Sequence, residues 1–215
     1  MLSHFRNKTA VSLCLLVVLT KMASSSLQAS EDWELWVAMN ARFSLTETFT
    51  FHVNPEVRIR DDFSDPYYVQ SRQGILYQGE PWYRLGLNYL YAQTERPTTK
   101  TYENRIEAEV SFFRKWAGVA WSMRNRLDSR FFSNGDFQER YRMRVEGVLP
   151  LTWLSDRISV YASEEIFLNF EGRSFSRNRL TGGFAYDLGD GISSAIYYMR
   201  QYGRGNTGPW TASNI

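Results

Sequence analysis

A single histidine is the first residue in this sequence with catalytic potential. His52 is the only histidine after residue 30, and it stands between Thr50 and Asn54. Beside a serine, a histidine can act as the general base of a hydrolase. The alternative is a structural histidine that hydrogen-bonds a neighbouring glutamate or asparagine. Because no Gly-x-Ser-x-Gly segment presents a nucleophilic serine, we predict no catalytic residues and expect that the chain is not an enzyme.

Metal chemistry is not indicated by the composition. Zinc sites combine several histidine, cysteine and carboxylate ligands, whereas the chain after residue 30 has one histidine and no cysteine. The sequence therefore predicts no metal site and no cofactor.

Closely spaced arginines form the second group with distinctive chemistry. Three of them lie in Arg124–Arg130 and three more in Arg140–Arg144. Guanidinium groups hold carboxylates in two-point contacts, so we expect nearby glutamates to pair with them. Two interpretations follow: an anion-selective constriction, or a salt-bridged plug that stiffens the protein, which we favour. The predicted charge network consists of Arg84, Arg105, Glu107, Glu109, Arg124, Arg126, Arg130, Arg140, Arg142, Arg144, Glu146 and Glu165.

The element that carries three of these arginines is a predicted strand, Phe137–Leu149. Apolar or small residues alternate there with Arg140, Arg142, Arg144 and Glu146. A strand sends successive side chains to opposite faces, so this period of two gives one apolar face and one charged face. The segment is about twice the usual strand length of 5–6 residues, as a tilted bilayer-spanning strand requires.

The same alternation recurs along the whole chain. It predicts about ten strands, with short and longer connections in alternation, which is typical of an antiparallel up-and-down barrel. The ten segments are Trp33–Phe43, Phe49–Arg60, Tyr67–Gln78, Trp82–Thr94, Tyr102–Phe112, Val119–Arg130, Phe137–Leu149, Ile158–Asn169, Arg177–Leu188 and Ile192–Tyr202.

Alternation alone does not say which face lies inside. A soluble barrel has its apolar face inside, whereas a membrane barrel has it outside. The apolar face here is crowded with aromatic residues, too bulky for the narrow interior of a small barrel. Aromatic residues also gather near strand ends, as in interfacial belts: Trp33, Tyr83 and the tryptophans at 82, 116 and 153. We therefore predict an all-β transmembrane barrel of about 10–12 strands, with a charged lumen and an apolar, aromatic exterior.

The first thirty residues have the plan of a cleaved secretory signal peptide. Arg6 and Lys8 precede an apolar run, Ala10–Leu19, and a small and polar stretch follows. Residues 31–215 are then a single barrel domain. Removing the three basic residues of the leader leaves 22 basic residues, twenty of them arginines, against 23 acidic ones. This balance gives no electrostatic reason to expect nucleic-acid binding.

Several segments together resemble a known bacterial family. They are DWELW (Asp32–Trp36), RIR (Arg58–Arg60), ENRIEAE (Glu103–Glu109), MRNRLD (Met123–Asp128), ERYRMRVE (Glu139–Glu146), EEIF (Glu164–Phe167) and NRLTGGFAYDL (Asn178–Leu188). Their order and spacing resemble the outer-membrane β-barrel family catalogued as domain-of-unknown-function family 2490, over essentially the whole chain after the leader. The resemblance implies an outer-membrane barrel and carries over no activity and no catalytic residues. Because members typically end in a further strand, we expect that this sequence lacks its C-terminal closing strand.

The functional expectation is a porin-like barrel of the Gram-negative outer membrane. It would serve as a structural scaffold or a narrow pore, with outer-membrane lipids and, during biogenesis, the barrel-assembly machinery as partners. The alternatives are an outer-membrane lipid-modifying enzyme, either a hydrolase or an acyltransferase, and a soluble periplasmic lipocalin-like carrier. The sequence does not specify an oligomeric state.

Overall fold

The described residues form one continuous sheet, in which every strand pairing except one is antiparallel. A computed structural model describes residues 14–16, 34–60, 64–171, 174–189, 192–203 and 211–215. The strands are β1 (Cys14–Leu16), β2 (Leu35–Ser44), β3 (Phe49–Arg60), β4 (Asp65–Glu80), β5 (Tyr83–Arg96), β6 (Thr99–Trp116), β7 (Val119–Phe132), β8 (Phe137–Pro150), β9 (Ile158–Asn169), β10 (Ser174–Gly189), β11 (Ile192–Gly203) and β12 (Thr211–Asn214).

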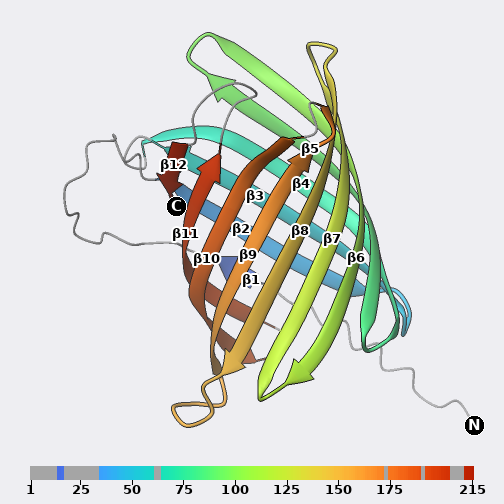
Figure 1. Cartoon of the computed structure of the whole chain (residues 1–215), viewed down its shortest axis with the longest axis vertical. Coiled ribbons are helices and arrows are strands. Elements are labelled where there is room, and N and C mark those ends of the chain that lie inside the picture. Colours follow the sequence, from blue (N-terminus) through green and yellow to red (C-terminus); the bar gives the residue numbers. More distant parts are fainter. Residues whose placement is uncertain (1–13, 17–33, 61–63, 172–173, 190–191, 204–210) are drawn as a thin grey trace, which may run out of the picture.

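The sheet has up-and-down topology and curls into a barrel (Figure 1). Each strand pairs with the next one in the sequence, in the order β1 to β12. The backbone of β1 pairs antiparallel with β2 and parallel with β11, so this short strand links the two ends of the row of ten long strands. The predicted fold class is confirmed. Most of the predicted leader lies outside the described residues, and its cleavage stays a prediction.

The two faces of the sheet divide as the alternation predicts. On β6, Glu103, Arg105 and Glu107 are buried inside the barrel, whereas Tyr102 and Ile106, which alternate with them, are exposed. The two faces differ strongly in exposure: Glu107 is 0% exposed, and Leu87 on the outer surface is 63% exposed. Other large apolar residues on the outside include Leu85, Tyr89, Trp121, Leu127, Val145, Phe184 and Ile196. The charged face is therefore the inner one, and the prediction of an apolar exterior is confirmed.

Aromatic residues occupy the strand ends. Trp82 lies in the β4–β5 turn, Trp116 ends β6 and Trp153 lies in the β8–β9 loop, and all three are exposed. Tyr83 begins β5, and its ring lies 4.7 Å from that of Trp82. Trp33, which we also expected at a strand end, lies outside the described residues.

A two-residue hairpin turn joins β6 to β7 at this end of the barrel. Its residues, Ala117 and Gly118, have φ angles of 51° and 80°. Two positive φ angles in succession are the mark of the type I′ turn, whose twist matches that of the flanking strands. The turn therefore fixes the register between β6 and β7, which decides how the charges on these two strands meet.

The described residues include no helix long and apolar enough to cross a membrane.

Candidate functional site

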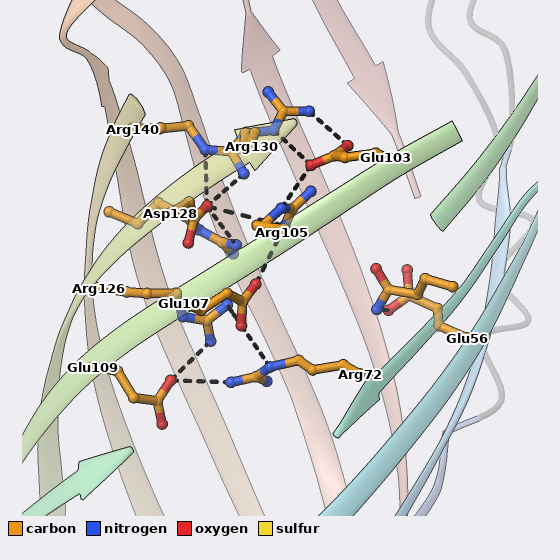
Figure 2. A network of polar contacts seen from close by, with 12 residues as sticks. Glu56, Arg72, Glu103, Arg105, Glu107, Glu109, Arg126, Asp128, Arg130 and Arg140 are labelled. Carbon is orange, nitrogen blue, oxygen red and sulfur yellow. Dashed lines mark hydrogen bonds and ion pairs between the residues drawn. The ribbon is translucent and has the colours of Figure 1, made fainter. Parts of the chain in front are cut away.

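The candidate site is a network of arginines and carboxylates on the inner face of the barrel, contributed mainly by β4 and β6 to β9. Register brings the charges together: Glu109 stands opposite Arg126, and Asp128 stands opposite both Glu107 and Arg140. Because every second residue faces inward, each strand contributes a row of charges rather than a single one. Figure 2 shows these rows meeting across the β6–β8 wall.

Glu107 is the centre of this network. Its carboxylate oxygens lie 2.7 Å from Nε of Arg72, 3.3 Å from Nη1 of Arg105 and 3.2 Å from Nη1 of Arg126. The contact with Arg72 is short but not aligned as a hydrogen bond, so it is mainly electrostatic. Glu109 holds two of the same arginines, at 3.0 Å from Arg72 and 3.2 Å from Arg126.

A second group of contacts lies nearer the β5–β6 and β7–β8 connections. Arg130 grips Glu103 with two hydrogen bonds, of 2.8 and 3.0 Å, and Arg105 donates to the same carboxylate at 2.7 Å. Arg140 donates twice to Oδ2 of Asp128, at 3.0 and 2.6 Å. Two-point contacts of this kind are the strong ones among charged groups.

Glu165 on β9 collects arginines from three strands. Its Oε1 lies 2.8 Å from Nη2 of Arg124 and 2.8 Å from Nη2 of Arg142, and its Oε2 lies 3.7 Å from Arg179. Taking a charge out of water costs several kcal/mol unless it is paired. The inner face therefore pairs most of its arginines by sharing Glu103, Glu107, Glu109, Asp128 and Glu165 among two or three guanidinium groups each.

Eleven of the twelve residues predicted for the charge network take part in ion pairs. Arg144 and Glu146 pair with each other on β8, and the other nine belong to the contacts above. Arg84 is the exception: its guanidinium lies 5.0 Å from the ring of Phe113, and its Nε has no hydrogen-bond partner among the described residues.

The predicted set omitted four residues that belong to the network. Glu103 and Asp128 lie on the charged faces of β6 and β7, where the alternation marks them. Arg72 and Arg179 come from β4 and β10. The alternation also marks these two as inward-facing, but nothing local in the sequence says which carboxylate they reach.

His52 is a buried structural residue. Its Nε2 lies 2.7 Å from Oδ1 of Asn88 on β5, although β4 runs between the two strands. The residue of β4 in register with both is Gly74. A Cβ at position 74 would overlap Oδ1 of Asn88 and lie 2.6 Å from the backbone oxygen of Leu87. The absence of a side chain thus makes room for the His52–Asn88 hydrogen bond. The described residues contain no cluster of potential metal ligands.

The other side of the lumen is built from aromatic rings and further arginines. The guanidinium of Arg58 lies 3.5 Å from the ring centre of Trp36 and 4.2 Å from that of Tyr68, and its Nε lies 2.5 Å from Glu56. Glu34 accepts hydrogen bonds of 2.8 Å from the indole of Trp36 and from the Tyr67 hydroxyl. A cavity of about 730 Å³ lies between this side and the network.

Comparison with known proteins gives a matching family model and similar solved structures. The family model described as "Protein of unknown function (DUF2490)" matches residues 33–212. The structure titled "Crystal structure of Pseudomonas aeruginosa OccK3 (OpdO)" has a TM-score of 0.39 and 12% identity, with 84% of this chain and 54% of that chain covered. This chain thus spans about half the length of that protein. No curated protein matches.

Proposed function

Because the chain belongs to the family described as "Protein of unknown function (DUF2490)", whose description names no activity, we propose a function for the chain from the geometry of the barrel. It is an outer-membrane β-barrel that serves as a scaffold or a narrow pore, with a lumen braced by ion pairs, and it is not an enzyme. The observation that carries this proposal is the inverted distribution of side chains. Charged residues such as Glu107 and Asp128 are buried, whereas Leu87 and Phe184 are exposed on the outer surface. An apolar outer surface of this kind is typical of barrels whose outer face contacts lipid.

Two aromatic belts support insertion in a bilayer. One belt includes Trp82 and Phe112, whose stacked rings are 6.3 Å apart, and the other includes Tyr91 and Tyr102, stacked at 6.4 Å. Tyr102 and Phe112 lie ten residues apart on the outer face of β6. Ten residues of strand span about 33 Å, and a tilt of about 40° reduces the height to about 25 Å, the usual apolar band of such barrels.

Strand β7 repeats this spacing. Trp121 and Phe131 are also ten residues apart and exposed, and the ring of Phe131 lies 5.0 Å from that of Phe137 on β8. Two strands with the same interval between outward aromatic residues are consistent with two parallel interfaces. Outer-membrane lipids and the barrel-assembly machinery are therefore the partners that we propose.

The competing functions fit the geometry less well. A soluble carrier would need polar residues on its outer surface, where this barrel has leucine, tyrosine and tryptophan. A lipid-modifying enzyme would need a base that reaches lipid, whereas His52 is buried and bonded to an amide. Neither alternative is favoured by a specific contact.

Fractionation of the protein, expressed with its leader in a Gram-negative host, tests the location. We expect recovery in the outer-membrane fraction and release only by detergent. Recovery in the soluble periplasm without detergent would exclude the proposal.

Planar-bilayer recording tests the state of the lumen. We expect little or no conductance, because the paired side chains along the inner wall fill part of the lumen. Any current should favour anions, and this preference should weaken when Arg142 or Arg144 becomes glutamine. A robust cation-selective current would contradict the proposal.

A further inference from the structure

The lumen cavity has more positive than negative charge around it. Among the described residues, twelve arginines and six glutamates line the cavity of about 730 Å³. Two more carboxylates, Glu109 and Asp128, pair with these arginines without lining the cavity themselves. Even with both included, eight carboxylates face twelve guanidinium groups. The ion-pair network therefore does not neutralise the space that it borders.

The surplus is concentrated around Phe167 on β9, which is almost completely buried. Four guanidinium groups lie close to its ring centre: Arg140 at 5.2 Å, Arg142 at 4.7 Å, Arg177 at 5.6 Å and Arg179 at 4.9 Å. A ring face attracts cations weakly. The ring of Phe167 therefore contacts the four guanidinium groups but does not neutralise their charge.

The carboxylates within reach of these four arginines are fewer than the arginines. Asp128 pairs with Arg140 at 2.6 Å and lies 3.6 Å from Arg142. Glu165 serves Arg142 at 2.8 Å and Arg179 at 3.7 Å, and it is also shared with Arg124. Two carboxylates therefore serve three of the four arginines around the ring.

Arg177 is the fourth, and no carboxylate among the described residues pairs with it. Its side chain is half-buried and lines the cavity. The charged groups that act on it most strongly are also arginines: Arg58, Arg130 and Arg142. Each of these already pairs with a carboxylate, at 2.5, 2.8 and 2.8 Å respectively. Arg177 thus presents an unused planar fork to the cavity, in a positive field that its neighbours maintain.

We propose that the lumen cavity binds a small oxyanion, a carboxylate or a phosphate, at Arg177. The guanidinium fork of Arg177 supplies two parallel N–H donors of the geometry that such oxyanions accept. The surplus of arginines supplies the positive potential. Oxyanion binding adds a ligand class to the proposed function. It rests on that function in one respect only, namely that the barrel lumen is accessible to water.

Calorimetric titration of the detergent-purified full chain tests the site. Inorganic phosphate and acetate are titrated separately at constant ionic strength, with chloride as the reference anion. We expect saturable binding of at least one oxyanion, and the comparison of the two identifies which source of negative charge fits. Equal heats for chloride and both oxyanions would overturn the proposal.

Variants locate the binding to one residue. Arg177→Gln should weaken oxyanion binding about 10-fold or more, as the loss of one charge-assisted contact does. The matched control is Arg200→Gln, which removes one positive charge from the exposed outer face of the neighbouring strand β11 and should leave binding unchanged. Undiminished binding by Arg177→Gln, or equal losses in the two variants, would refute the site.

Folding of the variant is not expected to interfere with this test. Arg177→Gln leaves no described carboxylate without its arginine, and it removes a charge that three arginines repel. Its thermal midpoint without oxyanion should not fall below that of the wild type. If Arg177→Gln nevertheless fails to fold, Arg177→Lys decides the matter: it keeps the charge but loses the planar fork, and binding at full strength would refute the site. Because these measurements are made in micelles, neither the cellular location nor the conductance affects their outcome.

Discussion

Replacing Glu107 by glutamine should remove the carboxylate on which the centre of the network depends. Glu107 is 0% exposed and touches Arg72, Arg105 and Arg126 at 2.7, 3.3 and 3.2 Å. The new amide can still accept through its oxygen, but its NH₂ group would face N–H donors. Removing one partner of a buried ion pair costs about 3–5 kcal/mol.

The structure allows this range to be narrowed. Each of the three arginines keeps another carboxylate: Arg72 and Arg126 retain Glu109 at 3.0 and 3.2 Å, and Arg105 retains Glu103 at 2.7 Å. None of them is left wholly unpaired, so we expect a loss near the lower limit, about 3 kcal/mol in the free energy of unfolding.

Urea unfolding in detergent micelles measures this loss, with Glu95→Gln as the control. Glu95 pairs with Lys100 at 3.0 Å, but both side chains are about half exposed, so that substitution should cost less than about 1 kcal/mol. Raising the salt concentration to 1 M shortens the screening length to about 3 Å. The effect of Glu107→Gln should survive this change because the contacts are buried. A loss no larger than that of Glu95→Gln would refute the reasoning.

Three further predictions concern the outer face and the His52 region. Leu87→Arg should destabilise the barrel by about 2–4 kcal/mol because it exposes a charge to lipid, whereas Arg84→Leu should cost less. The folded fraction after detergent refolding measures the stability of both variants. A larger loss in Arg84→Leu than in Leu87→Arg would mean that the charged face lies outside. Gly74→Ala should lower the thermal midpoint, because its Cβ would overlap Oδ1 of Asn88; an unchanged midpoint would contradict the close packing seen there. His52→Ala should lower the free energy of unfolding by about 1–3 kcal/mol, since the buried Asn88 loses its hydrogen-bond partner. The reconstituted wild type and the variant should both show no phospholipid hydrolysis. Hydrolysis that depends on His52 would overturn the proposal that the protein is not an enzyme.

Much of the fold was predictable because a period of two is a strong local signal. Segments such as Phe137–Leu149 specify the strand and both of its faces, and β8 begins at the predicted residue. The pairing of the arginines on β7 and β8 followed from the same signal. Adjacent strands present their inward charges to one another, and β6 supplies alternating glutamates.

The contacts that the sequence analysis did not predict are those decided by the arrangement of residues far apart in the chain. Arg84 was expected in the network, but Ser111 is its partner on β6, and a register shift between Tyr77 and Glu80 leaves it without a partner on β4. The sequence pattern also does not predict that Arg179 reaches Glu165 from β10, whereas Arg177 has no carboxylate partner among the described residues. These contacts depend on register shifts and on the curvature of the sheet. Neither property can be predicted from a local sequence pattern.

The distribution of lumen charges among strands also limits how the barrel can assemble. The β7–β8 hairpin by itself has six inward arginines and only two inward carboxylates, Asp128 and Glu146. Each arginine left facing lipid would cost about 2–4 kcal/mol, so this hairpin cannot enter a bilayer alone. Adding β6 and β9 brings one more arginine, Arg105, and four inward glutamates, so that seven arginines meet six carboxylates. The four strands from β6 to β9 are thus the smallest nearly neutral unit around this hairpin, and in a folding pathway they should insert together, in one cooperative step.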